Sequence, residues 1–229
     1  MQLSHLQRLN EARRARRAAM LITDLGSDES VVEIEGDEMR PDLREAIDNA
    51  YRSGRSGVVE TGDGRRLFLN VQVPPARIVI IGAVHISQAL ATMAAIAGFD
   101  VTVIDPRTAF ATPERFAEID LVADWPEDAL EKAPLDAYTA LVAVTHDPKI
   151  DDYPIIAGLR AKCFYVGALG SRKTHARRVE RLTDAGVAQG DIERIDAPIG
   201  LDIGAQSPAE IAVAVLGAII RAFRGRALG

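Results

Sequence analysis

The sequence has little cysteine, few aromatic residues and no long apolar segment. Cys163 is its one cysteine, so no disulfide can form within the chain, and we expect a cytoplasmic location. Aromatic residues make up only 5% of the 229 residues, so the core must consist mainly of aliphatic side chains. No apolar run reaches the roughly 18 residues that span a bilayer, so no membrane association is expected. The net charge of −6 argues against a nucleic-acid partner.

Two consecutive prolines, Pro74 and Pro75, separate two regions of different pattern. Such a pair fits neither a helix interior nor a central strand. The sequence therefore predicts a small α+β domain over residues 1–73 and a second domain over residues 77–229. Within the first, we expect helices near 3–20 and 41–51, short strands at 19–22 and 31–34, and a hairpin of 58–60 with 66–73.

The second region alternates short apolar runs with helical segments. Continuous apolar strands are typical of a parallel sheet that is covered on both faces. The fold class is therefore α/β, with a doubly wound, mostly parallel, Rossmann-like sheet. We expect strands at 78–81, 101–104, 140–144 and 163–166, and helices at 85–97, 127–132, 152–160, 171–184 and 207–224. The last helix has a strong start signal, because Ser207 and Glu210 form a capping-box pair around Pro208.

The first strand–helix turn of such a sheet is the expected ligand site, because the helix start offers free N–H groups. A full dinucleotide motif would place glycine at the positions of Gly82, Val84 and Ser87, and only Gly82 is present. His85 follows in the same turn, and Asp105 supplies the acidic residue expected about 20 residues later. The loop is thus either a ligand site or only a tight connection.

Other polar residues follow the ends of the later strands. The candidates for ligand contact are Arg107, His146, Gly167, Gly170, Ser171 and Arg172. For Asp105 and Arg107, a structural pair that ends the strand is an equal alternative. Two glycines, a helix-capping serine and an arginine suit phosphate binding, although the same residues also suit a glycine-rich turn before a solvated basic helix. Histidines without ligand spacing predict no metal site, and Cys163 in an apolar strand is expected to be a buried, inert thiol.

Six longer phrases complete the pattern: 105–107 (DPR) with 110–116 (FATPERF), 145–151 (THDPKID), 164–175 (FYVGALGSRKTH), and 198–205 (PIGLDIGA) running into 207–212 (SPAEIA). In this order and spacing, the region from about residue 78 to 220 resembles the C-terminal Rossmann-like domain of the xanthine dehydrogenase accessory factors, the XdhC/CoxI family. Members of that family commonly carry an N-terminal Gly-Gly-Cys loop, which this chain lacks.

The resemblance implies a non-catalytic accessory factor for a molybdenum hydroxylase of the xanthine or carbon monoxide dehydrogenase type. Such a factor binds a molybdopterin-type cofactor, including its dinucleotide form, and aids its insertion. A hydroxylase client and a cysteine desulfurase are the implied partners, and a homodimer is compatible with the size of the chain. Two alternatives stay open: an NAD(P)-binding oxidoreductase, which Asp105 favours, and a scaffold without a small-molecule ligand.

Overall fold

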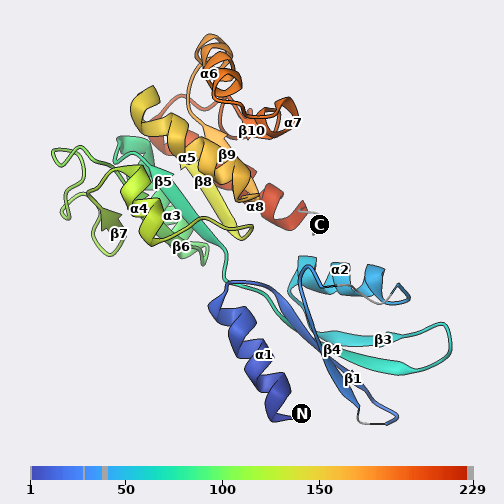
Figure 1. Ribbon diagram of the computed structural model, residues 1–229. Helices are drawn as coiled ribbons and strands as arrows, with labels where there is room; N and C mark the ends of the chain where they lie inside the picture. The colour runs from blue at the N-terminus through green and yellow to red at the C-terminus, as the bar shows by residue number, and fades with distance from the viewer. Residues whose placement is uncertain (1, 28, 38–40, 226–229) are drawn as a thin grey trace. The chain divides into compact units, whose positions relative to one another are not determined.

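The computed structural model describes residues 2–27, 29–37 and 41–225 (Figure 1). The chain forms two compact units, one that reaches to Pro74 and one that comprises Pro75–Phe223. The junction thus falls between the two consecutive prolines. Because each unit has its own sheet, the two are described separately.

The first unit is built on a four-stranded antiparallel sheet in the order β2-β1-β4-β3. Its elements are α1 (Leu3–Arg14), β1 (Ala19–Asp24), β2 (Ser30–Ile34), α2 (Arg44–Ser53), β3 (Gly57–Glu60) and β4 (Arg66–Gln72). Antiparallel pairing of β3 with β4 confirms the predicted hairpin. The first helix ends earlier than expected: Arg16 has a left-handed backbone with φ +51°, and the chain then enters β1. Leu9 of α1 packs against Leu21 of β1 in a small separate core.

The second unit contains a six-stranded, fully parallel sheet in the order β10-β9-β8-β5-β6-β7. Its strands are β5 (Arg77–Ile81), β6 (Asp100–Ile104), β7 (Asp120–Val122), β8 (Thr139–Ala143), β9 (Tyr165–Ala168) and β10 (Ile195–Asp196). The order places the first strand of the unit next to the fourth, as in dinucleotide-binding sheets. The predicted Rossmann-like fold class is confirmed.

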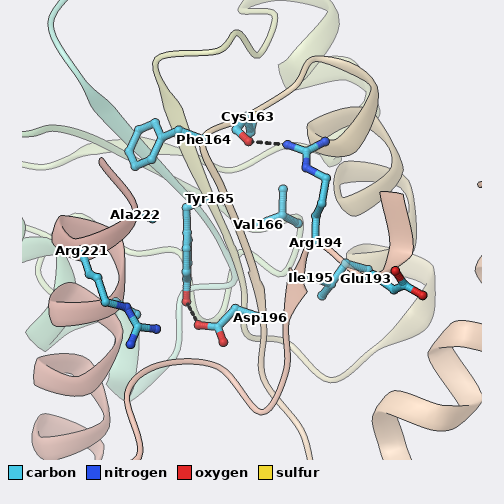
Figure 2. Close-up of a pocket in the computed structure, with 11 residues that line it drawn as sticks. Cys163, Phe164, Tyr165, Val166, Glu193, Arg194, Ile195, Asp196, Arg221 and Ala222 are labelled. Atoms are coloured by element: carbon cyan, nitrogen blue, oxygen red, sulfur yellow. Dashed lines mark hydrogen bonds between the residues drawn. The ribbon is translucent and has the colours of Figure 1, made fainter. Parts of the chain in front are cut away.

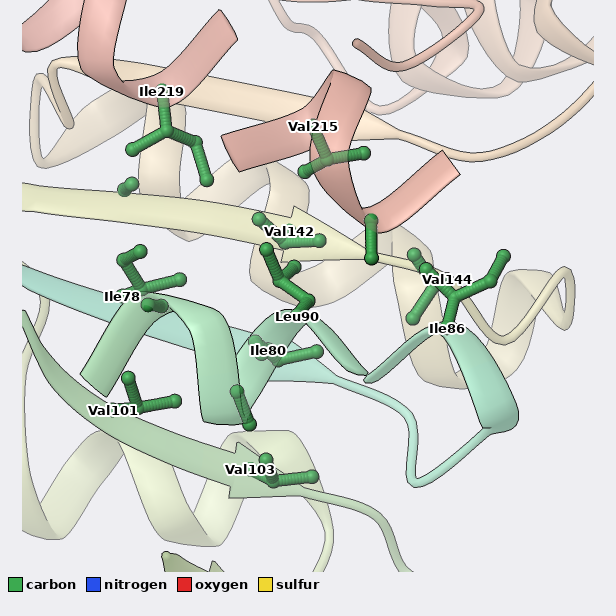
Figure 3. Close-up of a cluster of buried hydrophobic side chains, with 14 of the residues drawn as sticks. Ile78, Ile80, Ile86, Leu90, Val101, Val103, Val142, Val144, Val215 and Ile219 are labelled. Carbon is green, nitrogen blue, oxygen red and sulfur yellow. The ribbon is translucent and has the colours of Figure 1, made fainter. Parts of the chain in front are cut away.

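Helices cover both faces of this sheet. They are α3 (His85–Ile96), α4 (Pro126–Lys132), α5 (Pro148–Arg160), α6 (Arg172–Asp184), α7 (Gln189–Ile192) and α8 (Pro208–Gly225). Leu90 of α3 and Val215 of α8 pack with Ile80 and Val142 on one face (Figure 3). Apolar residues of α4, α5, α6 and α7 pack on the other face. Strand residues are buried on both sides, which explains their continuously apolar sequence.

Several boundaries differ from the sequence-based prediction. The helix expected at 152–160 begins four residues earlier, because Pro148 occupies its first turn and the Asp147 carboxylate accepts from the Lys149 N–H at 3.0 Å. The strand expected at 163–166 begins at Tyr165. Strands β7 and β10 and helix α7 were not predicted, since each has four residues or fewer and so too little periodicity. The predicted capping box is confirmed by bonds between Ser207 and Glu210.

No helix within the described part of the chain combines the length and the apolar character needed to cross a membrane.

Candidate functional site

The carboxyl edge of the parallel sheet carries most of the residues singled out from the sequence. Strands β5 and β8 are direct neighbours, and the chain leaves them toward opposite faces, into α3 and α5 respectively. Open parallel sheets bind ligands at this kind of switch point, outside the carboxyl ends of the strands. The loops after β5, β6, β8 and β9 therefore form the candidate site.

Gly82, directly after β5, has a conformation that other residues rarely adopt. Its φ is +114°, and a Cβ at this position would lie 2.7 Å from the Thr145 methyl carbon. The Gly82 N–H donates to the Ile104 carbonyl at 2.8 Å, and the buried Ser87 hydroxyl donates to the Gly82 carbonyl. Glycine is thus required here because the loops after β5 and β8 approach each other closely.

Asp105, after β6, is completely buried, and its carboxylate is fully used within the protein. Oδ1 accepts from the Arg107 N–H and from Arg107 Nε, both at 2.9 Å. Oδ2 accepts from the Ala83 N–H at 2.7 Å and from Arg107 Nη2 at 2.8 Å. A carboxylate offers about four lone-pair positions, so these four bonds saturate it. Burial opposes ionisation, but the bonds from Arg107 and Ala83 outweigh it and lower the pKa of Asp105.

These bonds give Asp105 and Arg107 a structural role. The carboxylate ties the β5–α3 loop to the end of β6, while the Arg107 guanidinium lies 4.7 Å from the centre of the Phe110 ring. A ribose-binding acid must present a free carboxylate oxygen to the ligand. Asp105 could do so only by breaking one of its bonds, which weakens the argument for a nicotinamide dinucleotide.

At the start of α3, Val84 is half-buried and His85 is exposed, whereas Ser87 is buried. Val84 is the N-cap residue of the helix, and no side-chain cap forms at this helix start in the described structure. The first-turn N–H groups therefore keep their donor capacity for an oxygen of a ligand. His85, the first helical residue, is exposed and lies beside them.

The loop after β8 is organised by Asp151, which is 1% exposed. Its carboxylate accepts from the Thr145 hydroxyl at 2.7 Å and from the His146 N–H at 3.1 Å. His146 adopts φ +65° within this turn, and its side chain is exposed. Burial raises the pKa of Asp151 to about 6, although the bonds from Thr145 oppose the shift.

We expect the Asp151 carboxyl to titrate near pH 6. Its folded pKa lies above the ordinary value of 3.8, so folding takes up a proton in this window and the contribution to stability falls as pH rises from about 4 to 6. Carboxyl-detected ¹³C NMR should show an inflection near pH 6 that is missing in Asp151→Asn. An Asp151 signal that titrates near pH 4 would contradict the burial argument.

The loop after β9 contains the glycine-rich phrase. Gly167 lies within β9, where a Cβ would come within 2.7 Å of Ile199, so packing accounts for this glycine. Gly170 has φ +140°, and Ser171 caps α6 by accepting from the Thr174 N–H at 3.2 Å. Arg172 is exposed at the first position of that helix. Gly170, Ser171 and Arg172 thus lie at the carboxyl edge, whereas Gly167 belongs to the core.

The sequence also suggested that the basic residues of α6 are exposed to solvent, and this is wrong for one of them. Arg178 is 2% exposed, whereas Arg172 and Arg177 of the same helix are exposed. Sequence reasoning missed Arg178 because it stands in a run of basic residues. Its spacing was the available signal: Arg178 lies four residues before the buried Leu182, and thus on the same helix face.

A cavity of about 420 Å³ lies at the opposite, amino edge of the sheet, between β9, β10 and α8 (Figure 2). There the Tyr165 hydroxyl donates to Asp196 at 2.6 Å, and Arg194 donates to the Cys163 carbonyl at 2.9 Å. Cys163 is buried, and burial raises the pKa of its thiol to about 12. Its thiol is therefore protonated and poorly nucleophilic.

Across the residues that the structure describes, no three His, Cys, Asp or Glu side chains gather into a group that could hold a metal ion.

The parallel sheet, its strand order and the helix starts at its carboxyl edge define a Rossmann-type α/β protein. Residues 78–219 match the XdhC Rossmann domain family, and the chain belongs to that family.

Three curated relatives extend the comparison. The chain is 31% identical over 182 residues to the uncharacterized protein YqeB of Escherichia coli K12, and 33% identical over 156 residues to a probable xanthine dehydrogenase subunit from Bacillus subtilis 168. It is 30% identical over 143 residues to the molybdenum cofactor insertion chaperone PaoD of E. coli K12. The alignments cover 74%, 68% and 62% of this chain, but only 32%, 45% and 39% of the respective relatives.

A crystal structure described as a xanthine dehydrogenase from Bacillus halodurans has a TM-score of 0.63 with this chain at 23% sequence identity. The match covers 97% of this chain and 65% of the other. At this level of identity, the likeness supports the shared fold.

Proposed function

We propose that this protein binds a molybdopterin-type molybdenum cofactor and helps to insert it into a molybdenum hydroxylase. Family membership and the 30% identity to a molybdenum cofactor insertion chaperone support the proposal. The observation that carries it is the start of α3 beside the switch point, where no side-chain cap forms among the described residues and the first-turn amides would donate to an anionic group. The proposal concerns binding and transfer, and it requires no turnover by this chain.

The donor set suits the anionic end of such a cofactor, which carries a phosphate, or a pyrophosphate in its dinucleotide form. The first-turn amides of α3 would hold phosphate oxygens, with His85 beside them. Gly170, Ser171 and Arg172 at the start of α6 would supply the second group of contacts, and the exposed Arg172 would add a positive charge. The bound cofactor would supply oxidation–reduction chemistry in the hydroxylase, whereas these residues would bind and orient its anionic end.

The partners belong to the same proposal. The client would be a hydroxylase of the xanthine or carbon monoxide dehydrogenase type, and a cysteine desulfurase would supply sulfur to the cofactor. Because the Cys163 thiol is buried and its pKa is raised, we propose that sulfur reaches the cofactor from the partner and not through this residue.

The first test is a pterin assay on protein purified from a host that makes molybdenum cofactor. After denaturation and oxidation, the wild type should release close to one fluorescent pterin per chain. Arg172→Ala should lower the pterin content at least about tenfold, since a charge-assisted phosphate contact is worth about 1.5–3 kcal/mol.

Arg160→Ala is the matched control. Arg160 is an exposed arginine at the end of α5, near the opposite edge of the sheet, so its loss should leave the pterin content unchanged. A folded wild-type protein that neither contains pterin nor takes up added cofactor would refute the proposal and favour a scaffold without a small-molecule ligand.

A further inference from the structure

A second concave site lies at the carboxyl edge, between the starts of α5 and α6. This cavity has a volume of about 190 Å³, compared with about 30 Å³ per molecule of liquid water, so it has room for a small anion. The residues that line it are His146, Pro148, Asp151, Asp152, Thr174, Arg177, Arg178 and Arg181. Most of them are polar, and three are arginines.

Arg178 is the unusual member of this lining. It is only 2% exposed, and its Nη2 donates to the Leu169 carbonyl at 3.0 Å. Its Nε and Nη1 are buried and have no hydrogen-bond partner in residues 2–27, 29–37 and 41–225. An unsatisfied buried donor destabilises a protein by about 1–3 kcal/mol, and by more when it is charged. Two such donors on one guanidinium therefore indicate a missing partner.

The neighbouring carboxylates do not fill this role. Asp151 directs its oxygens to Thr145 and to the His146 N–H. Asp152 is held by Arg181, with distances of 2.6 Å from Nε to Oδ2 and 3.0 Å from Nη2 to Oδ1. Both carboxylates attract Arg178 through space, but neither forms a hydrogen bond with it among the described contacts. The nitrogens that lack a partner thus belong to the cationic guanidinium of Arg178, and an anion is the acceptor that suits them.

The charges in the lining favour an oxyanion. Three arginines face two aspartates, so the lining is positive even before His146 is counted. One aspartate is neutralised by its pairing with Arg181. Thr174 belongs to the first turn of α6, where the helix dipole favours negative charge. Arginine is well suited to phosphate groups because its planar donors match their oxygens.

We propose that the cavity between α5 and α6 is a phosphoryl-binding site anchored by the buried guanidinium of Arg178. The ligand is a phosphate monoester or diphosphate, whose oxygens accept from Nε and Nη1 of Arg178, the two nitrogens without a partner among the described residues. Arg177 and His146 lie at the exposed rim, where they contact the same group. The phosphoryl group belongs either to the pterin cofactor or to a separate phosphorylated ligand.

Titration calorimetry of the full chain tests this site. Sodium pyrophosphate and inorganic phosphate are the ligands, and sodium chloride at equal ionic strength is the control titrant. The wild type should bind pyrophosphate, and Arg178→Met should weaken its Kd at least tenfold. Lys173→Met removes one cation from the same helix outside the cavity, and its Kd should stay within about twofold of the wild type. No binding by the wild type, or unchanged binding by Arg178→Met, would overturn the proposal.

Arg178→Met should fold, because methionine replaces a guanidinium with unsatisfied donors and removes one bond to a carbonyl. A second measurement does not depend on that variant: in wild-type protein, the ¹⁵N signal of Arg178 Nε should shift on addition of pyrophosphate. A signal that stays in place while other arginine signals move would also overturn the assignment.

The pterin content of Arg178→Met identifies the source of the phosphoryl group. If Arg178→Met loses both its pterin and its pyrophosphate binding, the site belongs to the cofactor. If it loses pyrophosphate binding but retains pterin, the site belongs to a separate ligand. The pyrophosphate measurements do not use pterin. They would stand if the proposed cofactor function failed, so the two failures are distinguishable.

Discussion

Replacing Asp105 with Asn should destabilise the protein by about 3 kcal/mol, the lower end of the range for breaking a buried ion pair. Asn keeps the size of the side chain, but it loses the charge that faces Arg107, and one carboxylate oxygen becomes an amide donor. The amide nitrogen cannot accept the hydrogen bonds that Ala83 and Arg107 donate to the carboxylate. Chemical denaturation at pH 7, followed by far-UV circular dichroism, measures the difference.

The pH dependence provides an internal check. The pKa of Asp105 is lowered on folding, so its contribution is present above the ordinary value of 3.8 and is lost as pH falls through the folded pKa. The unfolding free energy of Asp105→Asn should therefore fall less steeply than that of the wild type as the pH is lowered below about 4. Asp191→Asn is the control: its ion pair with Arg194 is exposed, and its loss should change the unfolding free energy by less than about 1 kcal/mol. Equal effects of the two substitutions would contradict the role given to Asp105.

Gly82→Ala should destabilise the protein by about 4 kcal/mol, the largest effect we expect from a single methyl group. The backbone conformation at φ +114° accounts for about 1–3 kcal/mol, and overpacking against Thr145 adds about 1–3 kcal/mol. If the loop shifts to relieve the clash, the amides at the start of α3 move with it. The pterin content should then fall together with stability.

Gly190→Ala is the matched control for this substitution. Gly190 lies in the short helix α7, and a Cβ added there would meet no heavy atom of the described residues within 4 Å. Alanine is the better helix former, so this variant should be as stable as the wild type or slightly more stable. A Gly82→Ala protein as stable as Gly190→Ala would mean that the close approach to Thr145 does not constrain the loop.

The alternation of apolar strands and helices was sufficient to predict the parallel α/β unit, because strands buried on both faces need continuous apolar runs. The prolines at 74 and 75 mark the junction between the compact units. The short elements β7, β10 and α7 were missed, since two to four residues carry almost no periodic signal. The predicted start of α5 is too late because an Asp-Pro pair, here Asp147-Pro148, is as typical of a turn as of a helix start.

The candidate site was only partly accessible from sequence. Gly82, His85, Asp105 and Arg172 follow the ends of predicted strands, and the structure has them at the carboxyl edge of the sheet, because all parallel strands end there. Three bonds to Asp105 come from Arg107, a pairing that the sequence left open, but only the folded structure shows that the Ala83 N–H of another loop completes the saturation of the carboxylate. The same limit applies to Arg178, whose basic neighbours in sequence suggested a solvated helix.

The sequence by itself determined the alternation of elements, the family phrases and the chemistry available at each strand end. These properties depend on local pattern, which is written along the chain. Tertiary structure alone decided which polar groups are already used. Ile199 packs on Gly167 from more than thirty residues away, and the buried Arg178 guanidinium keeps two nitrogens without a partner in the described part of the chain. Burial and hydrogen-bond satisfaction are set by segments that meet only after folding, so the protein's available binding groups become visible only in the folded structure.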